Sequence, residues 1–137
     1  MQPIQWSKWM SVGIDALDED HRVLVAIVNK LADEDNRRDP AIVESILDEL
    51  IDYTKRHFAA EEAEMRERAY PTYTAHKALH DSLTEQVESY RRRFQLERDA
   101  IGGEEVFEFC AGWLSKHILR EDTRFGEYAV KPAPARA

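Results

Sequence analysis

Cysteine is scarce in this sequence of 137 residues, where Cys110 is the only one. A single cysteine cannot close a disulfide within the chain, and it excludes zinc and iron–sulfur sites that are built from several cysteines. We expect Cys110 to be a small core residue. A chain of this composition suits a reducing compartment, so we expect a cytoplasmic protein.

Long apolar runs and positive charge are also in short supply. No run approaches the roughly 20 apolar residues that a membrane span needs. The first six residues lack the basic and apolar regions of a signal peptide, so we expect none. The chain has 19 Lys and Arg against 27 Asp and Glu, a net charge of −8. Because a surface this acidic repels phosphate, we expect neither a nucleic acid nor a membrane among its partners.

Glycine and proline are few, with five of each, and they divide the chain. Pro40, Pro71 and the pair Gly102 and Gly103 separate four long stretches in which apolar residues recur every three or four positions. These stretches cover residues 18–36, 40–69, 72–96 and 103–126. Their period and their short connections predict an all-α fold, an up-down-up-down antiparallel four-helix bundle with an N-terminal arm.

We expect three regions along the chain. Residues 1–17 form the arm, whose Trp6 and Trp9 would be costly to leave in water and should pack along the bundle. Residues 18–126 form the bundle itself. Residues 127–137 contain two prolines and few apolar residues, and we expect a flexible C-terminal tail. The protein is expected to be a monomer.

All five histidines lie on the apolar stripes of the predicted helices. A single histidine there is more often a core residue with satisfied hydrogen bonds than a metal ligand. Five imidazoles in one core are costly to bury, because each brings a donor and an acceptor that need partners. A bound metal removes that cost. The five are His21, His57, His76, His80 and His117.

Two pairs of potential ligands are spaced four residues apart, which places both members of a pair on one helix face. The pairs are His57 with Glu61 and His76 with His80. Five histidines and two carboxylates are too many ligands for one tetrahedral zinc ion. They suit two six-coordinate ions bridged by carboxylates, and imidazole with carboxylate is compatible with iron.

The chain resembles the hemerythrin family, and its single-domain bacterial members most closely. The ligand order of that family is an isolated histidine, H-x-x-x-E, H-x-x-x-H and then H-x-x-x-x-D. The sequence has DEDH at 18–21, HFAAE at 57–61, HKALH at 76–80 and HILRED at 117–122. All seven ligand positions are filled in order. The resemblance implies a metal site formed by His21, His57, Glu61, His76, His80, His117 and Asp122.

The resemblance further implies a cofactor of two non-haem iron ions joined by an oxo or hydroxo group. The iron with fewer protein ligands would bind O2 and release it unchanged. This implies an oxygen carrier, storage or delivery protein rather than an enzyme, with an O2-consuming enzyme as a candidate partner. In the family arrangement, one iron would be held by His76, His80 and His117. The other iron would be held by His21 and His57. Glu61 and Asp122 would bind both ions.

The family also has apolar residues beside its O2 pocket. A pocket without a proton donor favours reversible binding, because acid–base catalysis on bound oxygen needs one. Each of these residues taken alone is equally well explained as an ordinary core residue. The matching positions here are Leu24, Phe58, Trp113, Leu114 and Ile118.

Other functions compete with oxygen binding. Ferritin-like di-iron enzymes carry two E-x-x-H motifs, and the sequence has none, which excludes that superfamily. A di-iron protein with weak oxidase or peroxidase activity stays open, as does an O2- or redox-sensing module. Sensors usually carry an output domain, for which 137 residues leave no room. A plain iron-handling or structural metal site would need neither an open coordination position nor a dry pocket.

The carboxylate that follows His117 poses a geometric problem. Residues in an α-helix turn about 100° each, so Asp122 would lie about 140° from His117, and Glu121 would lie nearer its face. A π-type turn supplies the missing rotation. We therefore predict a π-type or otherwise irregular turn between His117 and Asp122, with Glu121 turned toward solvent.

The remaining acidic residues near the predicted ligands have ordinary explanations. Asp18, Glu19 and Asp20 place negative charge at a helix N-terminus, where the helix dipole favours it. Glu62 and Glu64 follow the predicted ligand Glu61, and we expect them on a solvated helix face.

Overall fold

A computed structural model describes residues 2–97 and 101–130 of the chain. The long helices are α1 (Asp15–Asn29), α3 (Pro40–Glu67), α4 (Tyr73–Leu96) and α5 (Gly103–His117). Shorter helices join or extend them: η1 (Lys8–Met10), η2 (Lys30–Ala32), α2 (Glu34–Arg38), the π-helical turn η3 (Ile118–Asp122) and α6 (Thr123–Val130). The described residues contain no strand, and none of their helices is both long and apolar enough to cross a membrane.

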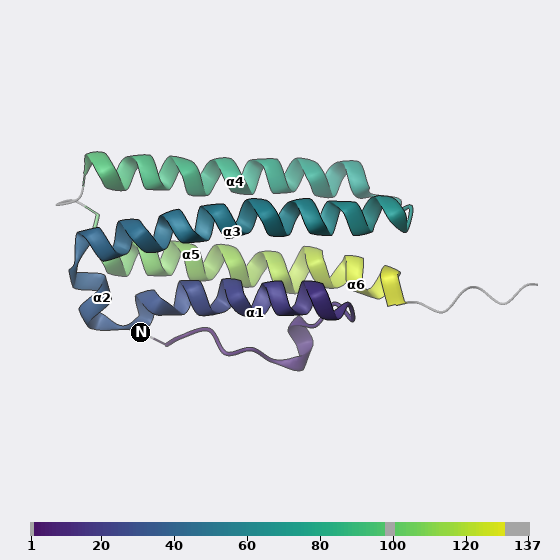
Figure 1. Ribbon diagram of the computed structural model, residues 1–137, viewed down its shortest axis with the longest axis horizontal. Helices are drawn as coiled ribbons and strands as arrows, with labels where there is room; N and C mark the ends of the chain where they lie inside the picture. The colour runs from purple at the N-terminus through teal and green to yellow at the C-terminus, as the bar shows by residue number, and fades with distance from the viewer. Residues whose placement is uncertain (1, 98–100, 131–137) are drawn as a thin grey trace, which may run out of the picture.

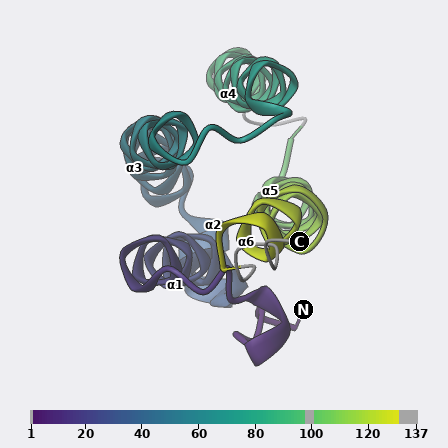
Figure 2. The same cartoon turned by 90° about the vertical axis from the view of Figure 1, so that its right-hand side faces the viewer.

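The four long helices lie side by side and alternate in direction along the chain (Figure 1). Seen end on, α1, α3, α4 and α5 surround a common core, and α3 packs against both α1 and α4 (Figure 2). Helix α5 leads through η3 into α6, which lies at the right-hand end of Figure 1. The predicted up-down-up-down four-helix bundle is therefore confirmed.

The first predicted helix is interrupted, which corrects the expected stretch of 18–36. Helix α1 begins earlier, at Asp15, and ends at Asn29. The side chain of Asp33 then accepts hydrogen bonds from the backbone N–H groups of Asp35 and Asn36 and starts the separate helix α2. An internal Asp can act as an N-cap in this way because its oxygen satisfies backbone donors that a continuous helix would use.

The N-terminal arm runs back along α1 (Figure 1). The side-chain amide of Asn29 exchanges two hydrogen bonds of 2.8 Å with the backbone of Ile4. Trp6 packs against the main core, as expected, and Arg22 lies over its ring. The same expectation is wrong for Trp9, which is 72% exposed, with Lys8 over its ring.

Asp18 ties the arm to the bundle and has a different role from the one expected. It is buried, and its carboxylate accepts hydrogen bonds from the Val12 backbone N–H at 2.8 Å and the Ser11 hydroxyl at 2.6 Å. The sequence pattern predicts only an interaction with the helix dipole. The bonds to the arm require the arm to lie beside α1, which spacing within one helix does not predict.

The C-terminal end is helical further than expected. Helix α6 continues to Val130, four residues past the predicted end of the bundle at 126. Residues 131–137 of the expected flexible tail lie outside the described residues. The division into arm, bundle and tail as separate units stays a prediction.

Two apolar clusters fill the bundle. The main one includes Leu24, Phe58 and Leu114, together with Cys110, which is fully buried as expected. A smaller one, at the end where α6 lies, consists of Val12, Leu17, Met65 and Phe125. Along α1, along α3, and along the continuous segment of α5, η3 and α6, the predicted metal ligands lie between a residue of the small cluster and a residue of the main cluster. The fold therefore places them in a polar layer between two apolar ones.

Candidate metal centre

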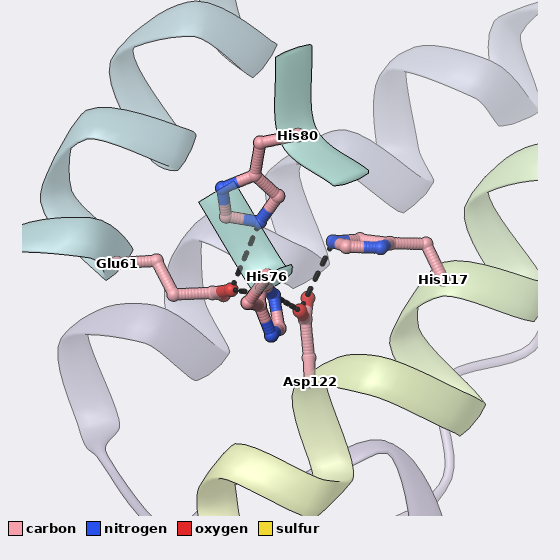
Figure 3. Close-up of side chains that lie close together, drawn as sticks. All are labelled: Glu61, His76, His80, His117 and Asp122. Carbon is pink, nitrogen blue, oxygen red and sulfur yellow. Dashed lines mark ion pairs between the residues drawn. The ribbon is translucent and has the colours of Figure 1, made fainter. Parts of the chain in front are cut away.

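The structure brings all seven predicted ligand residues together. His21 comes from α1, His57 and Glu61 from α3, and His76 and His80 from α4. His117 is the last residue of α5, and Asp122 is the last residue of η3. Each is at most 5% exposed. In Figure 3 the side chains of α3, α4, α5 and η3 point toward one another across the bundle.

Glu61 faces four imidazoles, two with each oxygen. Its Oε1 lies 3.0 Å from the Nε2 of His76 and 3.2 Å from the Nε2 of His80 (Figure 3). Its Oε2 lies 3.3 Å from the Nε2 of His57 and 3.6 Å from the Nε2 of His21. One carboxylate thus faces two separate pairs of histidines.

Asp122 divides its oxygens in the same manner. Its Oδ1 lies 3.0 Å from the Nε2 of His117 and 3.2 Å from that of His76 (Figure 3). Its Oδ2 lies 2.9 Å from the Nε2 of His21. Two groups of ligand atoms result, and both contain Glu61 and Asp122. One group adds His76, His80 and His117, and the other adds His21 and His57.

These atoms are suited to hold metal because they are buried without hydrogen-bond partners. All five Nε2 atoms and all four carboxylate oxygens lack a hydrogen bond of acceptable geometry. Each such buried atom costs about 1–3 kcal/mol when it has no partner. Imidazole nitrogens and carboxylate oxygens that converge on one volume supply the missing interaction to a metal ion. The donor set therefore fits a two-metal centre.

The metal-free site would hold protons. Burial alone lowers the pKa of His21, but the nearby carboxylates of Asp122 and Glu61 outweigh it and raise the pKa to about 10. The same balance raises the pKa of His76 to about 9. Burial would raise the pKa of Glu61, but its four imidazoles hold that pKa well below the usual value. A metal entering this site must displace the protons on these imidazoles.

Two outer carboxylates were missed by the sequence interpretation. Asp20 Oδ2 lies 3.0 Å from the Nδ1 of His57, and Glu62 Oε2 lies 2.8 Å from the Nδ1 of His80. The side chain of Glu62 is only 12% exposed, so its expected solvated position is wrong. Asp20 directly precedes the predicted ligand His21, and Glu62 directly follows the predicted ligand Glu61. This adjacency is the sequence signal that could have identified both carboxylates. The pairing itself joins different helices.

The predicted irregular turn is present. Residues 118–122 form the π-helical turn η3, which confirms the prediction. Asp122 is fully buried, whereas the side chain of Glu121 is 34% exposed and lies 4.0 Å from Arg124. The wider turn rotates Asp122 onto the face of His117, which a regular α-helix would give to Glu121.

Four of the five predicted pocket residues are buried in the main apolar cluster, namely Leu24, Phe58, Trp113 and Leu114. The Phe58 ring stacks on the His80 ring, with centroids 3.8 Å apart, and presents an edge to His117. Trp113 and His117 also line a cavity of ≈ 450 Å³ between α4 and α5. The side chain of Ile118 lies outside the described residues. A role of these residues in ligand binding stays a prediction.

The fold and the site together define a class, the four-helix bundles that build a metal centre from inward histidines and carboxylates. A model of the hemerythrin HHE cation-binding domain matches residues 12–129. The chain belongs to the hemerythrin family.

Individual relatives agree with that assignment. The chain is 34% identical over 127 residues to a bacteriohemerythrin of Stenotrophomonas maltophilia, covering 93% of this chain and 82% of the relative. It is 30% identical over 125 residues to a bacteriohemerythrin of Clostridium acetobutylicum, covering 88% and 96%. The crystal structure of a wild-type hemerythrin superposes with a TM-score of 0.81 at 28% identity, over 93% of this chain and 98% of that one.

Proposed function

We propose that this protein binds O2 reversibly at a non-haem di-iron centre and serves as an oxygen carrier, storage or delivery protein. Iron bound at this site in the ferrous state would supply the two electrons that reversible O2 binding needs. One iron would be held by His76, His80 and His117 and the other by His21 and His57, with Glu61, Asp122 and an oxo or hydroxo group between them.

The observation that carries this proposal is the division of the carboxylate oxygens. Glu61 turns Oε1 toward His76 and His80, and Oε2 toward His21 and His57. A carboxylate arranged in this way suits a bridge between two ions rather than a ligand to one. The two groups contain three and two histidines, so one ion receives one protein ligand fewer. That inequality supports a coordination position that is available to O2.

The residues around the site favour binding without reaction. Leu24 and Leu114 are 1% exposed, and Phe58 covers the His80 and His117 rings. These side chains are apolar and offer no acidic proton, and general acid catalysis on oxygen would need one. This supports a carrier rather than an enzyme.

The finer aspects of the function are proposals as well. We infer a monomeric protein of the cytoplasm that passes O2 to an O2-consuming enzyme.

Burial raises the pKa of the Cys110 thiol to about 12, so this cysteine is inert and needs no disulfide partner.

The test is repeated oxygenation of the iron-loaded protein. The protein is reduced without oxygen, exposed to air and returned to argon, while the visible spectrum is recorded over several cycles. We expect a ligand-to-iron charge-transfer band that appears in air and disappears under argon, with two iron ions retained per chain. Conversion in the first cycle to a spectrum that never reverts would contradict the carrier function. Catalytic consumption of added hydrogen peroxide would favour the oxidase or peroxidase alternative instead.

A further inference from the structure

A chain of three polar side chains connects the surface of α3 to the group of ligands that contains His57. The Tyr53 hydroxyl donates a hydrogen bond of 3.2 Å to Asp20 Oδ1. The other oxygen of the same carboxylate, Oδ2, lies 3.0 Å from His57 Nδ1. The side chain of His57 is 1% exposed, whereas that of Asp20 is 26% exposed. Each oxygen of Asp20 therefore has one partner.

The Asp20 carboxylate selects one state of the His57 imidazole. Its hydrogen bond from Nδ1–H keeps the proton on that nitrogen and leaves Nε2, which lies 3.3 Å from Glu61 Oε2, as the nitrogen that can bind a metal. A negatively charged acceptor behind an imidazole also makes the ring a stronger electron donor to a metal. Asp20 is therefore placed to strengthen the bond that His57 can form.

Tyr53 acts on Asp20 in the opposite direction. A hydroxyl that donates to a carboxylate draws negative charge away from the oxygen that faces the imidazole. Burial and the charge of Asp20 raise the pKa of Tyr53, so the hydroxyl keeps its proton at neutral pH and can donate. The geometry thus contains an opposing pair, a carboxylate that strengthens the ligand and a phenol that weakens the carboxylate.

We propose that Asp20 and Tyr53 are positioning residues that set the metal affinity of the two-histidine side of the centre, with Asp20 increasing it and Tyr53 moderating the increase. The inference rests on the proposed function only in requiring that His57 binds a metal. It assigns opposite effects to two residues that lie in one hydrogen-bonded chain.

The experiment is a Co2+ titration of metal-free protein followed by visible absorption, which involves no O2. We expect the two-histidine side to be the weaker of the two Co2+ sites, because it has one histidine ligand fewer. Asp20→Asn should weaken this site by about 10- to 100-fold, the range typical for loss of an outer partner. Tyr53→Phe should tighten that same site by a few-fold. Asp48→Asn is the matched control, because Asp48 is an exposed α3 carboxylate that pairs with Arg91 and should change neither site.

A weakened or unchanged site in Tyr53→Phe overturns the proposal, because a purely structural role would move both variants in one direction. This outcome decides the matter even if Asp20→Asn does not fold. Failure of reversible oxygenation together with opposite Co2+ shifts would remove the proposed function and leave this inference intact. Normal reversible oxygenation without opposite Co2+ shifts would support the proposed function and overturn this inference.

Discussion

Asp122 and Glu121 are neighbouring carboxylates in opposite environments. Asp122 is fully buried and faces the Nε2 atoms of three histidines, whereas Glu121 is partly exposed beside Arg124. By spacing alone Glu121 is the better companion of His117. The π-turn reverses that order, so the two residues form a natural pair for mutagenesis.

We predict that Asp122→Ala loses iron, because it removes both oxygens that face the two groups of histidines. Glu121→Ala should keep the iron content and change the free energy of unfolding by no more than about 0.5 kcal/mol, as is usual at the surface. Iron per chain and the visible spectrum of each purified variant measure this. Loss of iron in Glu121→Ala with retention in Asp122→Ala would show that the ligand assignment is wrong here.

Leu114 lies one helical turn before His117 and is almost fully buried. We predict that Leu114→Ala costs about 2–5 kcal/mol of stability, as other core truncations do. It should also accelerate autoxidation, because water gains access to the space beside the centre. Leu50→Ala is the control, since Leu50 is fully buried in the same cluster two turns before His57. Equal autoxidation rates in Leu114→Ala and Leu50→Ala would show that Leu114 contributes only to core packing and does not protect the centre from water.

Among the helical elements, α6 depends on close contact with the N-terminal arm. A Cβ added at Gly126 would lie 2.6 Å from the Val12 Cα and 2.7 Å from the Val12 carbonyl oxygen, both backbone atoms. The arm at that point is held by the hydrogen bonds of Asp18. The glycine therefore lets α6, and with it the π-turn that carries Asp122, approach the arm.

We predict that Gly126→Ala destabilises the protein by about 1–3 kcal/mol, the usual cost of an overpacked contact. Gly112→Ala on α5 is the matched control. A Cβ there meets nothing within 4 Å, so this change should stabilise the helix by about 0.5–1 kcal/mol. Denaturant unfolding of both variants measures the difference. If Gly126→Ala is as stable as the parent protein, the arm at Val12 can move to accommodate the added methyl group without loss of unfolding free energy, and the prediction is wrong.

For the molecule as a whole, the polar layer between two apolar clusters couples stability to metal. Without metal, the charged carboxylates and protonated imidazoles of this layer must stabilise one another. The pKa values of His21 and His76 are raised from 6.5 to about 10 and about 9. Their contribution to stability is therefore complete below about pH 6.5 and is lost as the pH rises toward those values.

We predict that metal-free protein loses melting temperature steadily between pH 6.5 and pH 10. Iron-loaded protein should melt higher throughout, because a ligand at 1,000 times its Kd adds about 4 kcal/mol. Its decline over the same pH range should be shallower, since the metal has replaced the protons. Calorimetry of both forms at several pH values tests this. Equal melting temperatures with and without iron would refute the coupling.

Most of the helices and two pairs of metal ligands could be predicted from local spacing in the sequence. Helical periodicity and capping are local, so the stretches of α3 and α4 and the four-residue pairs of His57 with Glu61 and His76 with His80 follow from spacing alone. Helical arithmetic alone favours Glu121, and it predicted the π-turn only in combination with the family's ligand pattern, which selects Asp122. The membership of the complete ligand set came from resemblance to a family, because spacing alone could not join residues of four helices.

Which atoms face one another depends on how the helices pack. The pairing of Asp20 with His57 spans 37 residues and that of Glu62 with His80 spans 18, and both join different helices. Such contacts depend on how two helices are rotated and packed, which no periodicity within one helix records. The burial of Asp18 against the arm and the exposure of Trp9 have the same origin. Local interactions select the helices, and packing between helices assigns each polar side chain its partner.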